Sequence, residues 1–213
     1  MKTAVLIPAY NEEKTLAQVL QVVLVCPNID EVVVISDGST DCTAQLARKL
    51  GAKVVELPKN LGKGAAIVAG LKATDAGLIV LLDADLVGLN PFHINLLLKP
   101  VYTGQADMTV GVFKYGRLST DLSQRLVPCL NGQRAMKRQI LESLSDLEQT
   151  RYGVDLIISR YAKNTRLRVK TVELVNLTQV MKEEKLGLLY GVAARLKMYW
   201  QILAALRYKL PPC

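Results

Sequence analysis

The sequence predicts an α/β fold in which helices cover both faces of a mostly parallel central sheet. Two features of the first half of the chain lead to this prediction. Short apolar runs rich in β-branched residues alternate with segments of helical periodicity, and acidic residues follow several of the apolar runs. Such alternation is typical of parallel strands joined by crossover helices. The chain has 213 residues and is 50% hydrophobic, which is enough for a single large domain with a substantial core.

The first half predicts three strand-helix repeats followed by a fourth strand. Apolar residues within 16–23 recur at spacings of three and four, so they form one face of a helix that Asn11 can cap. Ser39 or Thr40 can cap the second helix, and Gly51 can end it. The predicted strands are Thr3–Ile7, Glu31–Ser36, Lys53–Leu57 and Gly77–Asp83, with helices after Asn11, up to Leu50 and over Gly64–Ala73.

The second half has a less regular pattern. Pro91 is suited to the first turn of a helix, because its missing N–H has no partner there in any case. The remaining predicted elements are helices up to Leu98, around Gln133–Leu144, around Val154–Tyr161 and over Leu186–Lys209, a strand at Asp107–Phe113 and an edge strand at Leu167–Leu174.

The net charge of +8 lies entirely at the C-terminal end. Residues 1–150 hold 15 Lys+Arg and 15 Asp+Glu, whereas residues 151–213 hold 12 and 4, a difference of +8. A basic region favours an anionic partner, such as a phosphorylated acceptor or an anionic membrane surface. Nucleic acid is the least favoured partner, because few aromatic residues accompany the cations and no nucleic-acid-binding motif is present.

The cysteines and the apolar runs predict a cytoplasmic protein. The four cysteines are scattered without close pairs, which excludes a zinc knuckle and gives no sign of a disulfide framework. No run reaches the ~18 apolar residues that a membrane-spanning helix needs, and Pro8 stops the N-terminal run short of a signal-peptide core. We therefore expect a soluble protein or one peripheral to the inner face of the membrane.

The most informative motif is Asp83-Ala84-Asp85, which follows a fully apolar predicted strand. Residues i and i+2 of an extended chain point to the same side, so both carboxylates can face the crevice where open α/β sheets bind ligands. Such a carboxylate can hold Mg²⁺ or Mn²⁺, with water and diphosphate oxygens completing the shell. The alternative, which the triplet alone leaves open, is that both residues cap the next helix or face solvent.

Three other segments follow predicted strands or start helices. Asp37 can accept from the imide N–H of a base, and Tyr10 and Glu12 beside Pro8 can contact a base or ribose. Lys63, between two glycines at a helix start, is suited to approach phosphate or a base. Individually, the residues after the first strand also fit an ordinary turn into a helix with acids in its first turn.

Together these motifs resemble the nucleotide-sugar glycosyltransferases of the Rossmann-like GT-A fold, in the large family that includes dolichol-phosphate mannosyltransferase and glucosyl-3-phosphoglycerate synthase. The resemblance is firm over residues 1–115. It implies a nucleotide-sugar-binding half at 1–115, an acceptor half with the basic C-terminal helix at 116–213, and a Mg²⁺ or Mn²⁺ cofactor. The nucleotide-binding residues it implies are Pro8, Tyr10, Glu12, Asp37, Lys63 and Asp83, with Asp85 as the metal ligand and catalytic residue.

The resemblance also indicates residues for the acceptor. Arg117 and Arg134 would bind acceptor phosphate or the leaving diphosphate, although each could equally be a surface arginine. Asp155 would be a catalytic base, although an acid at a helix start is nearly as well explained by the helix dipole. Val87 and Gln179 stand where some relatives have further metal ligands. His93, in the first turn of a helix, is expected to be structural.

The sequence therefore predicts metal-dependent transfer of a sugar from a UDP- or GDP-linked donor to a lipid-phosphate or a small phosphorylated or hydroxyl acceptor. Two other functions remain open. One is a non-catalytic nucleotide-binding or scaffold protein, and the other is a sugar-nucleotide pyrophosphorylase, which would need a glycine-rich signature where Pro8-Ala9-Tyr10-Asn11 stands. The apolar stripe of Leu186–Lys209 can dock on an anionic membrane, on the protein's own core or on a second subunit in a homodimer.

Overall fold

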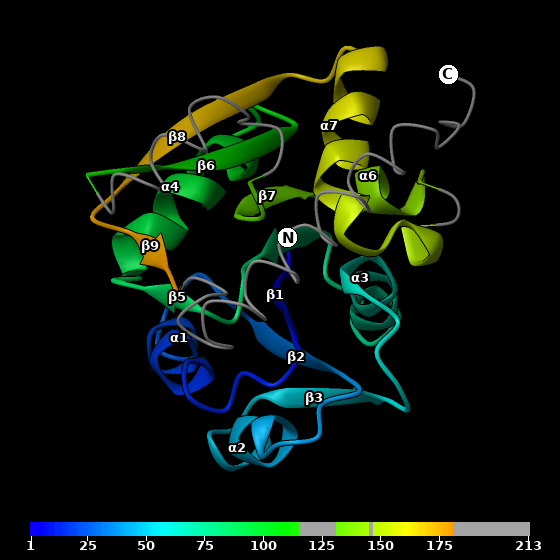
Figure 1. Cartoon of the computed structure of the whole chain (residues 1–213). Coiled ribbons are helices and arrows are strands. Elements are labelled where there is room, and N and C mark those ends of the chain that lie inside the picture. Colours follow the sequence, from blue (N-terminus) through cyan, green and yellow to red (C-terminus); the bar gives the residue numbers. More distant parts are fainter. Residues whose placement is uncertain (116–130, 145–146, 181–213) are drawn as a thin grey trace.

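The computed structural model describes residues 1–115, 131–144 and 147–180, and its centre is a seven-stranded sheet (Figure 1). The strand order is β3-β2-β1-β4-β7-β6-β8, and all neighbours pair in parallel except β7, which is antiparallel to β4 and β6. The α/β prediction is confirmed. The strands are β1 Thr3–Ala9, β2 Glu31–Asp37, β3 Lys53–Leu57, β4 Leu78–Leu81, β6 Met108–Lys114, β7 Arg134–Lys137 and β8 Val169–Val175, and β5 Leu86–Val87 pairs separately with β9 Thr178–Gln179.

Helices cover both faces of the sheet, and a separate apolar core lies beneath each set. One core joins α1, α2 and α4 to the sheet, and the other joins α3, α6, α7 and a short 3-10 helix to the opposite face. Strand alternation explains the division, because successive side chains of β1 point to opposite cores. The helices are α1 Leu16–Val23, α2 Thr43–Lys49, α3 Lys63–Lys72, α4 Pro91–Tyr102, α6 Arg138–Glu142 and α7 Val154–Asn164, with the 3-10 helix η2 at Leu147–Gly153.

The residues predicted to cap the first two helices instead join the loops that precede those helices. Asn11 has a left-handed backbone (φ 55°), and its side-chain oxygen accepts from the Thr40 N–H at 2.8 Å. The Asn11 N–H donates to the Ser39 hydroxyl at 3.1 Å. The helices begin later, with Thr15 and Cys42 at their N-cap positions. These cap predictions were wrong, because the polar side chains bind the neighbouring loop rather than their own helix.

The prediction of a helix around Gln133–Leu144 was also wrong in its first part. Arg134–Lys137 form β7, which inserts antiparallel between β4 and β6, and only Arg138–Glu142 are helical. Ala135 and Met136 are buried on opposite faces of the sheet. Pairing on both sides therefore overrides the helical periodicity.

Other elements agree with the sequence or lie outside the described residues. β8 is an edge strand, as predicted, and α4 extends four residues beyond Leu98. The predicted helix Leu186–Lys209 and Arg117 lie outside the residues that the structure describes. No helix among the described residues is long and apolar enough to cross a membrane.

Helix α3 packs against η2 through Gly64, which has no side chain to separate them. A methyl group at this position would overlap the backbone oxygen of Leu147 and the hydroxyl oxygen of Thr150. Because backbone moves less easily than the end of a side chain, this contact restricts position 64 to glycine and fixes the start of α3, where Lys63 lies.

We expect Gly64→Ala to lower the free energy of unfolding by about 1–3 kcal/mol, the usual cost of overpacking, even though alanine favours helices. Urea unfolding measures the change. Gly70→Ala in the same helix is the comparison and should cost less, because its methyl would meet side-chain carbons and no backbone atom. The nearest are Cδ1 and Cγ1 of Ile35 at 2.7 and 3.0 Å and Cδ2 of Leu6 at 3.3 Å. A Gly64→Ala variant as stable as the parent would contradict this packing argument.

Candidate active site

The candidate site lies at the carboxyl ends of the parallel strands. β4 ends at Leu81, and Asp83 and Asp85 follow in the turn that leads into β5. The alternative interpretation of these acids as helix caps is wrong, because Asn90 occupies the N-cap of α4 and accepts from the His93 N–H at 3.2 Å. The backbone oxygen of Asp85 accepts from the Val180 N–H at 3.1 Å, so β9 returns the distant residue 180 to this turn.

Lys63 joins two carboxylates that lie far apart in the sequence. Its Nζ is 2.9 Å from Oδ1 of Asp83 and 3.0 Å from Oδ2 of Asp155. The second oxygen of Asp83 accepts from the Gln133 side-chain amide at 2.7 Å. Residues from α3, the turn after β4, the segment before β7 and the first turn of α7 therefore form one buried cluster, to which we refer as the Lys63 cluster.

Burial and charge shift the pKa values of this cluster. Burial would lower the pKa of Lys63, but the charges of Asp155 and Asp83 outweigh it and raise this pKa above its ordinary value. Burial raises the pKa of Asp155, and the charges of Lys63 and Arg134 oppose that rise. Lys63 therefore stays charged and holds both carboxylates in place.

Arg134 has a different role from the predicted one. Its side chain is 0% exposed, and the guanidinium donates to the backbone oxygens of Asn131 at 2.8 Å and Asp155 at 3.0 Å, and to the Ser159 hydroxyl at 2.9 Å. A group with this burial and these partners does not fit the predicted grip on acceptor phosphate. Arg134 instead fixes the first turns of α7, which carry Asp155.

Gly132 lies directly over the Lys63 cluster. A methyl group at this position would come within 2.5 Å of Nζ of Lys63 and 2.7 Å of Oδ2 of Asp83. Nothing in the local sequence indicates this contact. Gln133 was missed as a site residue altogether, because nothing in its local sequence indicates a partner 50 positions away.

Asp37 is 4% exposed and organises the loop before α3. Its two carboxylate oxygens accept from the backbone N–H groups of Leu61 and Gly62, each at 2.8 Å. Charged hydrogen bonds of this kind are strong. They hold the loop that presents Lys63, and the predicted contact with a base stays a prediction.

The segment after β1 lies beside the loop after β2, to which Asn11 joins it by hydrogen bonds. Tyr10 is 43% exposed, as suits a ring that would lie against a ligand. The Glu12 carboxylate accepts from the Thr15 hydroxyl at 2.7 Å, and the Glu12 N–H donates to the Thr43 hydroxyl at 2.8 Å. Pro8 lies in β1 opposite Ile35 of β2. The roles predicted for these residues in nucleotide binding are not tested by these contacts.

Two other residues bear on metal binding. His93 is buried, and its Nε2 lies 3.0 Å from the Val175 backbone oxygen, so its predicted structural role is confirmed. Gln179 pairs with Leu86, next to Asp85. Within the described residues, no group of three or more His, Cys, Asp and Glu side chains could hold a metal ion. A metal at Asp85 would therefore need oxygens from water and substrate.

Comparison with known proteins decides the family. The model of the family "Glycosyl transferase family 2" matches residues 4–160. The chain belongs to this family. Glucosyl-3-phosphoglycerate synthase of Mycobacterium tuberculosis is 30% identical over 212 residues, covering 82% of this chain and 64% of the relative. Undecaprenyl-phosphate 4-deoxy-4-formamido-L-arabinose transferase of Edwardsiella ictaluri is 31% identical over 153 residues, covering 67% of this chain and 46% of the relative. The chain thus spans less than two thirds of the length of these family 2 relatives.

Solved structures of similar proteins share the fold. The synthase from Mycobacterium tuberculosis in complex with phosphoglyceric acid has a TM-score of 0.78 and 27% identity, covering 96% of this chain and 78% of that one. The same enzyme with Mn²⁺ and UDP-glucose has a TM-score of 0.77, 27% identity and coverage of 96% and 77%. The predicted family and the predicted GT-A fold are confirmed.

We expect Lys63→Met to lower the free energy of unfolding by about 3–5 kcal/mol at neutral pH, because two carboxylates lose their buried cation. Loss of Lys63 lets burial raise the pKa of Asp155 further. A carboxyl whose pKa is higher in the folded state than in the unfolded state stabilises the fold less as pH rises. The loss in free energy of unfolding caused by Lys63→Met should therefore be largest at neutral pH and above. It should become smaller as the pH falls toward the ordinary carboxyl pKa of about 4.

Urea unfolding between acid and neutral pH measures this effect. Lys72→Met is the matched control, because it removes an exposed ion pair with Glu148 from the same helix, and such pairs contribute at most about 1 kcal/mol. If the loss of stability in Lys63→Met did not change with pH, the ionisation of Asp155 could not be its cause.

Proposed function

We propose that this protein transfers a sugar from a UDP-linked donor to a phosphate-bearing acceptor, with Mg²⁺ or Mn²⁺ bound at Asp85. The observation that carries the proposal is that Lys63 holds Asp83 and Asp155 together, with Asp85 two residues after Asp83 in the turn that follows β4. Ligand complexes of the synthase support it, because they contain Mn²⁺ or Mg²⁺ together with UDP or UDP-glucose. The GDP-linked donor predicted as an alternative has no such support.

The described residues fit a hard divalent cation. Asp83 is held by Lys63 and Gln133, and Asp85 follows two residues later in the same turn. One protein carboxylate with diphosphate and water oxygens is a usual coordination set for Mg²⁺ and Mn²⁺. When bound, the cation would stabilise negative charge on the leaving diphosphate as the bond to the anomeric carbon breaks.

The nucleoside would lie over the ends of β1 and β2. The exposed ring of Tyr10 supplies a stacking surface. Glu12 and Asp37 supply carboxylates from the segments that follow β1 and end β2, which Asn11 joins by hydrogen bonds to Ser39 and Thr40. Asp83, whose carboxylate Lys63 and Gln133 hold at the ends of these strands, would approach the ribose. A preformed site of this kind loses little conformational entropy when the donor binds.

The acceptor side favours a substrate that needs little help from a base. Oδ2 of Asp155 is taken by Lys63, and its Oδ1 lies 3.9 Å from Nε of Arg134. Asp155 is only 6% exposed, so its carboxylate could take a proton from an acceptor hydroxyl only by giving up its pair with Lys63. A phosphate acceptor is already anionic and needs no such step. The similar proteins act on phosphoglycerate or undecaprenyl phosphate by name, and both contain phosphate.

The C-terminal basic region would bring such an acceptor close. Its excess of eight positive charges attracts either a soluble phosphate compound or an anionic membrane surface. Peripheral membrane contact and a homodimer through Leu186–Lys209 stay proposals, because those residues lie outside the described part of the chain.

Turnover with defined donors and acceptors tests the proposal. The full chain is incubated with UDP-glucose or GDP-mannose and MnCl₂, and with 3-phosphoglycerate or undecaprenyl phosphate, and the released nucleoside diphosphate and the product are measured. UDP release that depends on Mn²⁺ and on one acceptor supports the proposal. Donor binding without any release or transfer would favour the non-catalytic alternative, which the lack of a multi-residue metal cluster among the described residues also allows.

We expect Asp85→Asn to lower kcat by about 10²–10³-fold, the usual cost of losing one electrostatic contact to a developing charge. The melting temperature should stay close to that of the parent, because Asp85 is not part of the apolar core. Asp75→Asn, at an exposed acid, is the control and should keep full activity. Equal kcat values for Asp85→Asn and the parent would exclude Asp85 as the metal ligand.

A further inference from the structure

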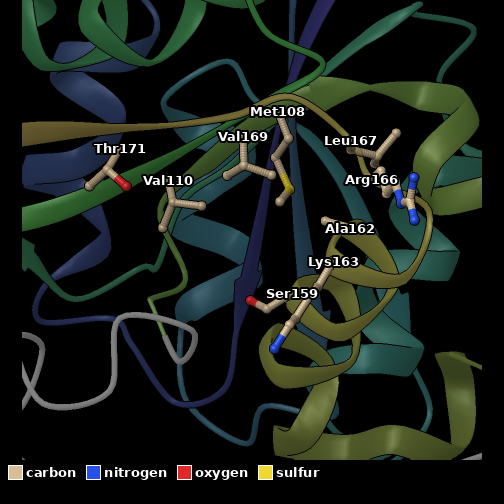
Figure 2. A pocket seen from close by; sticks show the side chains of 9 residues that line it. All are labelled: Met108, Val110, Ser159, Ala162, Lys163, Arg166, Leu167, Val169 and Thr171. Carbon is tan, nitrogen blue, oxygen red and sulfur yellow. The ribbon is translucent and has the colours of Figure 1, made fainter.

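A pocket of about 300 Å³ lies between α7 and the strands β6 and β8, apart from the Lys63 cluster (Figure 2). Its floor is apolar and consists of Met108, Val110, Ala162, Leu167 and Val169. The volume is at the lower end of the range for small-molecule sites, about 300–1,000 Å³, and an apolar lining with a few polar groups is characteristic of them. The pocket can therefore hold a short apolar chain.

The pocket exists because α7 covers only part of this face of the sheet. Met108 and Val110 belong to the core beneath α7, whereas Val169 at the start of β8 is 45% exposed. Val172 and Leu174 on the other face of β8 are buried in the core beneath α4. The face of β8 that points toward α7 is thus the less covered one.

Two cations line the pocket without an acid. Lys163 and Arg166 lie at the end of α7 and in the turn after it, and no carboxylate of the described residues forms an ion pair with either. Arg168, two residues later, differs because Asp107 holds it at 2.9 Å. The polar residues that complete the lining, Ser159 and Thr171, are uncharged. The pocket is therefore positively charged beside an apolar floor.

We propose that this pocket binds a single-chain anionic amphiphile, an alkyl chain that ends in a phosphate or a carboxylate. The chain would lie on the apolar floor, and the anionic group would meet Lys163 or Arg166, whose charged ends extend in different directions (Figure 2). Inorganic phosphate would leave the floor unused, and a neutral chain would leave the cations unpaired.

Two residues that line the pocket also contact Arg134, the residue that positions Asp155. The Ser159 hydroxyl accepts from Arg134 at 2.9 Å, and the Met108 sulfur lies 4.0 Å from Nη1 of Arg134. Arg134 in turn donates to the backbone oxygen of Asp155. A bound chain would therefore contact two partners of Arg134 while lying outside the Lys63 cluster.

Binding of decyl phosphate below its micelle concentration tests the proposal without any assay of sugar transfer. Isothermal titration calorimetry on the full chain gives the affinity, and the ¹³C-methyl NMR signal of Met108, assigned with Met108→Leu, reports on the floor. We expect decyl phosphate to bind and to shift this signal, and decanol and inorganic phosphate to bind at least about tenfold more weakly. Equal affinity for decanol or for inorganic phosphate would overturn the proposal, as would no binding of decyl phosphate.

Variants of adjacent residues in β8 locate the site. Thr171 lines the pocket and is exposed, so Thr171→Trp should fill it with little risk to folding. Lys170→Trp is the matched control, because alternate residues of a strand point to opposite faces. We expect Thr171→Trp to weaken decyl phosphate binding by about tenfold or more and Lys170→Trp to change it less than about twofold.

The contribution of the two cations to decyl phosphate binding is tested with charge-removing variants. Lys163→Gln combined with Arg166→Gln removes both cations that line the pocket and should weaken decyl phosphate binding by about tenfold or more, whereas Lys170→Gln should not. Unchanged affinity in both Thr171→Trp and the double variant would show that the amphiphile binds elsewhere and would overturn the proposal.

Discussion

The Lys63 ammonium group is the interaction on which the rest of the candidate site depends. Asp83 and Asp155 would repel each other if no cation lay between them, and water would screen the repulsion only in part, because Asp155 is buried and Asp83 is partly buried. Lys63 removes the repulsion and joins the turn after β4 to the first turn of α7. The precise start of α3, fixed by the contact of Gly64 with η2, is therefore a requirement of the site as well as of the fold.

A second layer of contacts supports this group. Asp37 holds the two amides that precede Lys63, Gln133 orients Asp83, and Arg134 holds the backbone at Asp155. Asp37 ends β2, whereas Gln133 and Arg134 are adjacent residues at the start of β7. The strand order brings them together, since β7 returns beside β4 and carries residues 131–134 to the strand ends.

Local patterns in the sequence were sufficient to predict the part of the site that follows the parallel strands. An apolar run followed by an acid identified Asp83, and Asp37 after the second strand was found in the same way. The links to Gln133 and Asp155 could not be predicted, because they join residues 50 and 92 positions apart. β7 was missed because Arg134–Lys137 continue into a helix and have no β-branched residue. The burial of Arg134 was missed because an arginine is rarely so buried, and its partners are mainly backbone oxygens.

The internal pairing of Lys63 and Arg134 also bears on how the negative charge of a diphosphate would be balanced. Both cations were predicted to meet phosphate, yet Lys63 already neutralises two carboxylates and Arg134 is enclosed beneath the site. Moving either toward a ligand would leave a buried carboxylate or backbone oxygen without its partner, which costs more than a new contact at the surface contributes. The described residues are therefore arranged for a site in which a divalent cation, rather than these two side chains, balances the charge of the leaving group.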